Sequence, residues 1–467
     1  MEPQQASAGC SKIIFINRFF YPDYAATSEI LSDLAFGLAE RNFRVSVITS
    51  RLRYDRPIDL LPDHERRHGV DIFRVWTSRW GRQRLPGRAL DYACFYVSAA
   101  RQLWRLARLG DVIVAKTDPP LISVVAACVA RLRGAKLVTW QQDIFPEVAE
   151  RLSLGGALGR LMFAALHAPR NWSLRQAARN VVVGERMATT LHQSGVEPSA
   201  ISVLENWSDG TRIFPIDPEQ NSLRSAWGVG DSFVVGYAGN LGRAHDIETI
   251  LPVIHAFSGE KPNSRMPRVT FLFVGGGALR PSLEQEVTRS GLANVVFRDY
   301  QPPEQLGATL SVPDLHLVSL NPKLEGCVVP SKIYAIAAAG RPAIFIGDPS
   351  GELARIINDT GMGFAVPTNA WQQLRDCILR LAGNPQMKME MGERARRAFE
   401  QHWDKPIAIH KWAKLLNDVL GESNKTGPDS AAASEDDLNR IEVPSRSARV
   451  RDVGRDRGAV AKDATVE

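Results

Sequence analysis

Short runs of β-branched and aliphatic residues alternate along this chain with longer amphipathic stretches. Residues 13–17 and 45–49 have the pattern of buried strands, and residues 28–40 between them repeat apolar positions at the helical period. Further strands are predicted at residues 70–76, 111–115, 136–140, 180–183 and 201–204. Such alternation of strand and helix predicts a parallel sheet that helices cover on both faces.

A second series of the same kind begins further along the chain. Its predicted strands are residues 233–238, 269–274, 294–297, 315–320, 343–346 and 363–366. The segment 206–225 between the two series is rich in Asp, Pro, Ser and Asn, which favours an interdomain linker. Two helices are predicted after the last strand, a charged one at residues 386–401 and one at residues 407–420 with an apolar face.

These patterns predict two domains and a tail. A chain of 467 residues is too long for one ordinary core. We expect an N-terminal domain at residues 1–210, a second domain at residues 211–403, and a helix at residues 404–422 that returns to the first domain. Residues 423–467 are rich in Ser, Asp, Arg, Lys and Ala with almost no aromatic residues, and we expect them to be disordered.

Charge and composition exclude some classes of protein. The net charge of +6 is mild for this length, and no compact basic stripe interleaved with aromatic residues is present, which disfavours nucleic-acid binding. The five cysteines are far apart without metal-ligand spacing and are typical of reduced core residues. The first residues lack the apolar run of an export signal, and the longest apolar stretch, residues 121–130, is too short to span a bilayer. We therefore expect a cytoplasmic protein, with peripheral membrane contact left open.

The most informative motif is residues 324–342, LEGCVVPSKIYAIAAAGRP. Ser331 and Lys332 lie at a predicted helix start, and a Gly-x-Pro sequence ends that predicted helix. A helix N-terminus binds anions, whereas a lysine in the first turn opposes the helix dipole unless an anion is present. Lys332 and Glu325 are thus candidates for binding a sugar phosphate, with a solvated lysine and a solvated loop acid as the alternatives.

This motif resembles the donor site of GT-B glycosyltransferases of family 4, the retaining, glycogen-synthase-like group. Its pattern E-G-x-x-V-P-S-K-x-Y is most similar to the capsule, colanic-acid and O-antigen transferases. The resemblance implies two Rossmann-like, doubly wound parallel-sheet domains that face a central cleft. It also implies retaining, metal-independent transfer, without a cofactor, from a UDP- or GDP-linked sugar to a glycan or a polyprenyl-diphosphate-linked acceptor in surface polysaccharide biosynthesis.

A glycine-containing turn, Gly239-Asn240-Leu241-Gly242-Arg243, follows one of the predicted strands. Glycine lets backbone N–H groups approach a diphosphate, although many such turns have no ligand. The resemblance gives Arg243 and Lys332 the diphosphate, with His245 as a lesser candidate, and it gives Glu325 the hydroxyls of the donor sugar. It also places Gly276, Pro330 and Ser331 in the donor site. Asp143, which follows strand 136–140, matches a catalytic or acceptor-orienting position, although helix capping is nearly as good an explanation.

The sequence departs from the family pattern in two places. The second acidic residue of the family motif falls on Ile333 or Ala335, depending on the end from which positions are counted. A pair of alanines, Ala25 and Ala26, stands where relatives often have glycines. A non-catalytic GT-B-like partner subunit and a nucleotide-sugar epimerase of the same fold therefore remain as alternatives. A dehydrogenase is disfavoured because the first strand is not followed by G-x-G-x-x-G.

Two basic amphipathic stretches, residues 88–108 and 158–179, carry aromatic residues among arginines. Helices of this kind can lie on an anionic membrane, which would suit a lipid-linked acceptor. Most such stretches are surface helices with one face on the core. Membrane contact and ordinary surface helices both remain as interpretations.

Overall fold

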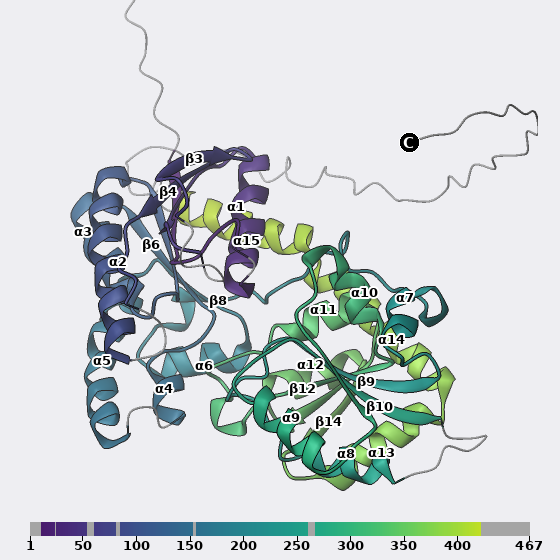
Figure 1. The fold of residues 1–467 in the computed structure, drawn as a ribbon. Helices are drawn as coiled ribbons and strands as arrows, with labels where there is room; N and C mark the ends of the chain where they lie inside the picture. Colours follow the sequence, from purple (N-terminus) through teal and green to yellow (C-terminus); the bar gives the residue numbers. More distant parts are fainter. Residues whose placement is uncertain are drawn as a thin grey trace, which may run out of the picture. The chain divides into compact units, whose positions relative to one another are not determined.

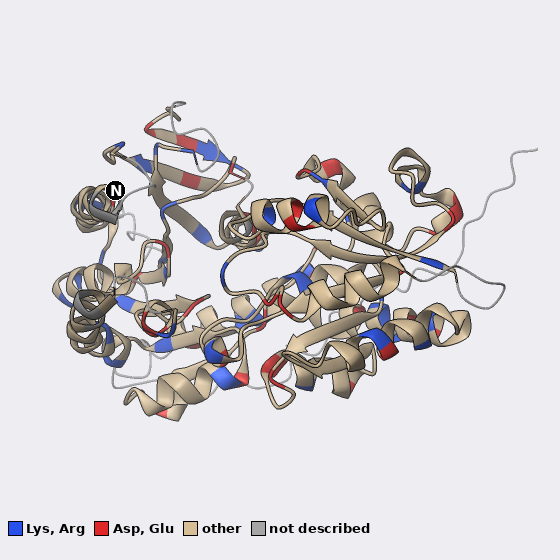
Figure 2. Cartoon of the chain, turned by 60° about the horizontal axis from the view of Figure 1, so that its bottom comes forward, with Lys and Arg blue, Asp and Glu red and all other residues tan. Residues whose placement is uncertain are grey.

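The computed structural model describes residues 11–23, 25–53, 60–80, 85–152, 156–259 and 267–421, which form two successive α/β domains (Figure 1). The tail expected at residues 423–467 lies outside the described residues. Among the helices that the structure describes, none is long and apolar enough to cross a membrane. In the view of Figure 2, basic and acidic residues are interspersed along the helices of both domains.

The first domain is built on an eight-stranded sheet in the order β3-β4-β2-β1-β5-β6-β7-β8. The strands are β1 (Lys12–Ile16), β2 (Arg44–Ser50), β3 (His64–Arg67), β4 (Val70–Val75), β5 (Val112–Lys116), β6 (Lys136–Gln141), β7 (Arg179–Val182) and β8 (Ile201–Val203). All neighbours pair in parallel except β3 and β4. The doubly wound parallel sheet predicted from the sequence is confirmed.

Strand β3 was not predicted because its sequence, HERR, has no apolar alternation. It pairs antiparallel with β4 across a two-residue turn at His68 and Gly69, whose φ angles are +45° and +80°. Positive φ at both central residues matches the twist of a tight hairpin. Turn geometry and backbone pairing therefore form this edge strand without an apolar face of its own.

Helices cover both faces of the first sheet (Figure 1). They are α1 (Ala26–Glu40), α2 (Leu85–Leu106), α3 (Ile122–Arg133), α4 (Glu147–Arg151), α5 (Gly156–Gln176) and α6 (Glu185–Gln193), with a single 3₁₀ turn at Pro198–Ala200. Ile14 and Ile16 of β1 share a core with α2 and α3, whereas Ile13 and Phe15 share another with α1. Alternate residues of one strand thus face opposite helical layers, which is why the strands are apolar throughout.

The second domain has a six-stranded parallel sheet in the order β11-β10-β9-β12-β13-β14. Its strands are β9 (Ser232–Ala238), β10 (Arg268–Val274), β11 (Val295–Arg298), β12 (Leu315–Ser319), β13 (Ala343–Gly347) and β14 (Gly363–Pro367). Its helices are α7 (Ser222–Ala226), α8 (Ile250–Ser258), α9 (Arg280–Arg289), α10 (Leu306–Ser311), α11 (Lys332–Ala338), α12 (Glu352–Thr360), α13 (Trp371–Ala382) and α14 (Pro385–Ala398), with 3₁₀ turns at Pro218–Gln220, Pro303–Gln305 and Pro322–Leu324. This strand order is that of a Rossmann fold.

The chain leaves the second domain through a π-helical turn, Phe399–Trp403, and continues as α15 (Lys405–Gly421). Helix α15 packs into the first domain, where the ring of Trp412 lies 4.6 Å from that of Trp140 in β6. Lys136 at the start of β6 donates a hydrogen bond of 2.5 Å to the carbonyl of Val419 near the end of α15. Helix α15 therefore completes the apolar layer that α1 begins.

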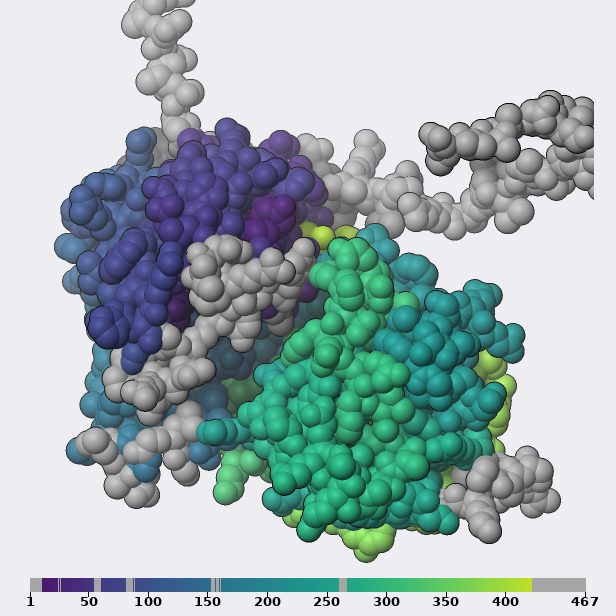
Figure 3. Space-filling model, viewed as in Figure 1, coloured from purple at the N-terminus to yellow at the C-terminus, as the bar shows by residue number. Residues whose placement is uncertain are grey.

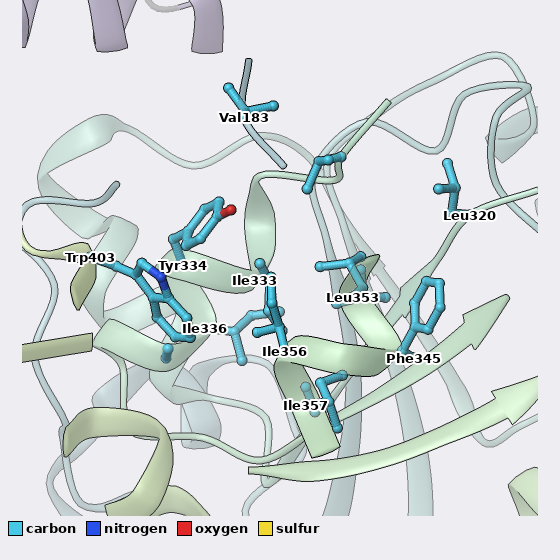
Figure 4. Close-up of a cluster of buried hydrophobic side chains, with 14 of the residues drawn as sticks. Val183, Leu320, Ile333, Tyr334, Ile336, Phe345, Leu353, Ile356, Ile357 and Trp403 are labelled. Atoms are coloured by element: carbon cyan, nitrogen blue, oxygen red, sulfur yellow. The ribbon is translucent and has the colours of Figure 1, made fainter. Parts of the chain in front are cut away.

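One apolar cluster joins the two domains. It contains Ile144, Val183 and Met187 of the first domain together with Ile333, Tyr334 and Leu353 of the second, several of which Figure 4 shows. Tyr334 also meets the ring of Trp403 edge-on, with centroids 5.4 Å apart. The shared cluster fixes the start of α11 against the first domain.

Candidate functional site

The strand order of the second sheet reverses between β9 and β12. At such a point the loops after the two strands separate, and ligands bind at the carboxyl edge between them. The loop after β9 contains Gly239 to Arg243, and the loop after β12 runs through Glu325 to Lys332. The topology therefore brings together the two segments that the sequence analysis selected.

Lys332, the first residue of α11, is a largely enclosed cation without an acidic partner. Its Nζ donates a hydrogen bond of 2.6 Å to Oη of Tyr237 in β9 and lies 3.8 Å from the centroid of the same ring. Burial alone lowers the pKa of the Lys332 ammonium to about 7. No ion pair joins Lys332 to a carboxylate in the described part of the chain. Such a group is poised to accept the negative charge of a ligand.

Two glycine loops lie together next to Lys332. Leu241 N–H donates to the carbonyl of Gly276 at 2.7 Å, and Gly239 N–H donates to that of Val274 at 2.8 Å. Gly239 has a φ of +113°, and a Cβ added there would lie 3.9 Å from Lys332 Nζ. A Cβ at Gly275, with a φ of +121°, would come within 2.4 Å of the Gly239 carbonyl oxygen. Glycine is thus required for both loops to pass beside the lysine.

The remaining residues of the first loop differ in how they are held. Arg243 and Asn240 are exposed, and within the described ranges no hydrogen bond or ion pair engages the guanidinium of Arg243. His245 Nδ1 lies 2.7 Å from the carbonyl oxygen of Ser319, and burial together with the charge of Lys332 lowers the pKa of His245 to about 4. His245 is therefore neutral near pH 7, while Arg243 is free to bind an anion. Gly242 lies against the side chain of Asn240.

Glu325 lies in the loop after β12 and binds a helix terminus. Its Oε1 accepts a hydrogen bond of 2.8 Å from the N–H of Glu352, the first residue of α12. Burial raises the pKa of the Glu325 carboxyl group above its usual value. Arg151 of the first domain donates hydrogen bonds of 2.8 Å to the Glu325 carbonyl and 3.1 Å to that of Lys323. The loop is therefore held from both domains.

Glu352 continues this chain of contacts. Its Oε2 accepts from the N–H of Arg186 at 2.9 Å, near the start of α6 in the first domain. The Arg186 side chain donates to the Ser350 carbonyl, just before α12. Two carboxylates, Glu325 and Glu352, thus lie at the N-terminal ends of two helices, where the helix dipole stabilises negative charge.

Asp143 follows β6 of the first domain and lies beside the Glu325 loop. It forms an isolated antiparallel bridge with Val328, and the next residue, Ile144, donates its N–H to the Cys327 carbonyl at 2.9 Å. Solvent reaches Asp143, yet the surrounding protein desolvates its carboxyl group and raises the pKa to about 6, against the opposing charge of Lys116. The structure therefore brings Asp143 to the same loop as Glu325.

The other predicted residues lie in the same loops. Pro330 and Ser331 connect the strand-like bridge at Val328 to α11, and Ser331 precedes Lys332 directly. Gly276 packs near Tyr300, whose ring atoms lie 3.2 Å from the position of an added Cβ. The glycine loop and Tyr300 therefore adjoin.

The two positions on which the missing second acid could fall, Ile333 and Ala335, have different surroundings in the structure. Ile333 has no exposed surface and lies in the shared apolar cluster. Ala335 is partly exposed, and three residues after Lys332 on a helix it lies on the same face as that lysine. An acid at position 335 would be the one near Lys332, and this chain has alanine there.

Several residues of this site were missed from the sequence. In the sequence, Tyr237 has the pattern of an ordinary strand residue. The charged residues Arg151, Arg186 and Glu352 have the pattern of surface helix positions. No local pattern links them to the loops they contact. Lys116 could have been noticed, because a lysine that ends an apolar strand is unusual; it is 1% exposed, and its Nζ lies 3.7 Å from the Trp140 ring centroid.

Comparisons with known proteins agree with this arrangement. Residues 27–207 match the glycosyl transferase 4-like domain, and residues 232–384 match the glycosyl transferases group 1 domain. The probable glycosyltransferase WbjE of Pseudomonas aeruginosa is 28% identical over 364 residues, which cover 76% of this chain and 85% of WbjE. The putative colanic acid biosynthesis glycosyl transferase WcaI of Escherichia coli (strain K12) is 26% identical over 278 residues, 58% of this chain and 65% of WcaI.

Solved structures share the fold. HepE of Anabaena in complex with UDP-glucose superposes with a TM-score of 0.65 at 18% identity, over 87% of this chain and 99% of HepE. Sucrose-phosphate synthase of Thermosynechococcus elongatus gives a TM-score of 0.70 at 15% identity, over 88% of this chain and its full length. Two parallel-sheet Rossmann-like domains with the site described above define a GT-B glycosyltransferase. The chain belongs to family 4 of these enzymes, uses a nucleotide-sugar donor, and is related to the polysaccharide glycosyltransferases WbjE and WcaI.

The contact between Glu325 and α12 predicts an effect on stability. Removing the acceptor with Glu325→Ala should lower the free energy of unfolding by about 1 kcal/mol, the usual cost of losing a helix N-cap. Glu325→Gln, which keeps an acceptor oxygen, should lose less. Urea denaturation followed by circular dichroism measures both, with exposed Glu393→Ala as the matched control. Equal stability of the Glu325→Ala variant and the unmutated chain would contradict the capping role.

Proposed function

We propose that this chain transfers a sugar, with retention of configuration and without a metal ion, from a UDP- or GDP-linked donor to a hydroxyl of a glycan acceptor. Arg243 and Lys332 bind the diphosphate of the donor, and the glycine loops at Gly239 and Gly276 approach it with their backbones. The leaving phosphate takes the proton of the acceptor hydroxyl during attack on the same face. The protein contributes positioning and charge stabilisation.

The observation that supports this proposal best is the environment of Lys332. Its ammonium group is enclosed, hydrogen-bonded to a neutral phenol 2.6 Å away, and not paired with an acid in the described residues. Arg243, also without a partner there, lies on the neighbouring loop. Two cations without acidic partners at the switch point of a parallel sheet suit a doubly charged leaving group.

Two carboxylates complete the proposed site. Glu325 has one oxygen on the α12 N–H, so its other oxygen can accept from a hydroxyl of the donor sugar. Asp143, with a pKa of about 6, is mostly ionised near pH 7 and can accept a hydrogen bond from the acceptor hydroxyl. Its contact with Val328 puts it beside the donor loop.

The alternatives from the sequence analysis were a non-catalytic subunit and an epimerase. Ala335 in place of an acid removes one carboxylate from the face of α11 that carries Lys332. With alanine at position 335, no carboxylate there competes with a bound diphosphate for the charge of Lys332. We therefore favour an active transferase over a non-catalytic subunit.

The first test concerns the diphosphate. Arg243→Ala and Lys332→Ala should each weaken binding of UDP or GDP by about 1.5 to 3 kcal/mol, roughly tenfold to more than a hundredfold, because each removes a charge-assisted contact. Isothermal titration calorimetry measures the change. Arg397→Ala and Lys414→Ala, which remove exposed charges elsewhere, should bind nucleotide as the unmutated chain does. Unchanged affinity in both site variants would overturn the donor-site assignment.

The pKa of Lys332 predicts a pH dependence of nucleotide binding. A bound diphosphate favours the protonated amine, so its pKa rises on binding and affinity is fully present below pH 7. Above pH 7 the free amine must take up a proton to bind, and affinity should fall by up to about tenfold per pH unit. His245, with a pKa of about 4, does not titrate in this range. Calorimetry between pH 7 and 9 should show the decrease, and Lys332→Arg should abolish it.

We also propose that the acceptor is linked to polyprenyl diphosphate and that the first domain contacts an anionic membrane. The support is a set of exposed apolar and basic residues, the tip patch, at the C-terminal ends of α2 and α3. It consists of Trp104, Arg105, Arg108, Leu109, Arg131 and Leu132. Arg133 lies 5.1 Å from the Trp104 ring centroid and joins the two helix ends. Apolar side chains among arginines suit a surface of anionic lipid headgroups.

Sedimentation with vesicles tests this contact. The chain should pellet with phosphatidylglycerol-rich vesicles more than with phosphatidylcholine vesicles, and less as salt shortens the Debye length toward about 8 Å. Replacing Arg108 and Arg131 with serine, or Trp104 and Leu109 with serine, should reduce pelleting. Arg397→Ser and Met389→Ser, exposed in the second domain, serve as controls. Equal pelleting with both kinds of vesicle at low salt would leave α2 and α3 as ordinary surface helices.

A further inference from the structure

Two adjoining hollows lie on the first domain, away from the residues assigned above. One, of about 340 Å³, lies between the β3–β4 hairpin and α2, and the other, of about 410 Å³, lies between the ends of β2 and β4. Trp76 lines both. Strands β3 and β4 and helix α2 contribute to the dark-blue surface in Figure 3. The two hollows share this indole as a lining residue, and together they are called the recess.

Two indoles in this recess are open to solvent. Trp76 is 63% exposed and Trp80 is 75% exposed, so neither contributes much to the core. Exposed tryptophans offer a flat apolar face with a polar edge and are typical anchors of binding surfaces. The C–H faces of a sugar ring can stack on an indole while its hydroxyls stay hydrated. The pair of indoles thus suits a carbohydrate of at least two units.

The charge of the recess is positive. Arg101 and Arg105, one helical turn apart on α2, line the first hollow, and Arg79 lines the second. None of these three has an acidic partner among the residues that the structure describes. Asp63, the acid that lines the recess, is ion-paired with Arg51 at 2.6 Å. An anionic ligand is therefore favoured.

Nearby acids are engaged as well. Asp91 accepts hydrogen bonds from Ser78 at 2.6 Å and from the Trp80 N–H at 3.1 Å. Glu65 pairs with Arg74 at 2.5 Å. These contacts fix the backbone around Trp80, and within the described ranges they leave the three arginines without an acidic partner.

The recess lies at the functional edge of the first sheet. Residues 76–80 follow the carboxyl end of β4, and Arg51 follows that of β2. Asp143 follows β6 at the same edge, because these strands are parallel. An acceptor bound in the recess would thus lie at the same carboxyl edge of the sheet as Asp143, with β2, β1 and β5 between the strands that carry them.

We propose that the indole–arginine groove, formed by Trp76, Arg79, Trp80, Arg101 and Arg105, binds an anionic oligosaccharide as the acceptor. The indoles stack on sugar rings, and the guanidinium groups bind carboxylates of acidic sugars or phosphates attached to the glycan. The inference rests on the proposed transferase function and specifies its acceptor class. The shared chemistry is a sugar chain that carries oxyanions.

Direct binding tests the groove without requiring turnover. Tetragalacturonate, a carboxylated glycan, glucose 1-phosphate, a phosphorylated sugar, and neutral maltotetraose are titrated into the full chain by calorimetry. At least one anionic probe should bind, with maltotetraose at least roughly tenfold weaker. Preference for tetragalacturonate would identify carboxylates as the recognised groups, and preference for glucose 1-phosphate would identify phosphates. Failure of both anionic probes to bind, or equal binding of maltotetraose, would overturn the proposal.

Variants locate the binding. Binding of the anionic probe should become weaker by roughly tenfold or more in each of three variants, as expected for interface anchors. They are Trp76→Ala, Trp80→Ala and the double change Arg101→Ser with Arg105→Ser. Matched controls outside the hollows are Trp104→Ala and the double change Arg108→Ser with Arg131→Ser, which should change affinity less than twofold. Equal weakening by the controls would contradict the assignment to this groove.

Nucleotide binding separates this proposal from the donor site. All groove variants should bind UDP as the unmutated chain does, because the donor residues lie in the second domain. Loss of probe binding with intact UDP binding supports the groove, whereas loss of both in a groove variant that still shows the native circular dichroism spectrum would contradict it. If Arg243→Ala and Lys332→Ala left UDP binding unchanged, the donor assignment would fail while the groove measurement stood.

Discussion

The proposed donor site depends on one enclosed amine, Lys332, which has no acidic partner among the residues that the structure describes. Lys332 has Tyr237 as its hydrogen-bond partner, at 2.6 Å, and burial lowers its pKa to about 7. Removing an ammonium group from water is unfavourable unless a partner compensates it. Gly239 adjoins the amine, since a Cβ added there would lie 3.9 Å from it. The unpaired amine supports the proposal that a ligand, rather than a side chain, neutralises this charge.

The position of that cation depends in turn on contacts far along the chain. Ile333 and Tyr334, the residues after Lys332, lie in the apolar cluster shared with the first domain. Glu325 binds the start of α12, and Glu352 of α12 binds the backbone of Arg186. Arg151 holds the Glu325 loop through two carbonyl groups. The loop from Glu325 to Lys332 is therefore held by hydrogen bonds of charged side chains and by one apolar cluster.

The balance of charges in this site differs from the family pattern for a local reason. The family motif has a second acid, and here the position on the Lys332 face is Ala335. No carboxylate stands at that position, and desolvation by burial lowers the pKa of Lys332. The first domain brings the carboxylate of Asp143 to this loop through the bridge with Val328. Desolvation raises the pKa of Asp143, and the charge of Lys116 partly offsets that increase.

The sequence by itself determined the two parallel sheets and the family, and it selected the loops that we propose for the donor site. Those features are local: apolar runs set the strands, and glycines, Ser331 and Lys332 stand at strand ends and a helix start, where ligands bind in such sheets. The tertiary structure alone decided which side chains meet. Tyr237 becomes the partner of Lys332, Glu325 a cap for α12, and Trp76 the common wall of two hollows, because these neighbours are set by strand order and helix packing between distant segments. A local pattern of hydrophobic and polar residues indicates whether a segment is a helix or a strand. It does not indicate which distant residues pack against that segment.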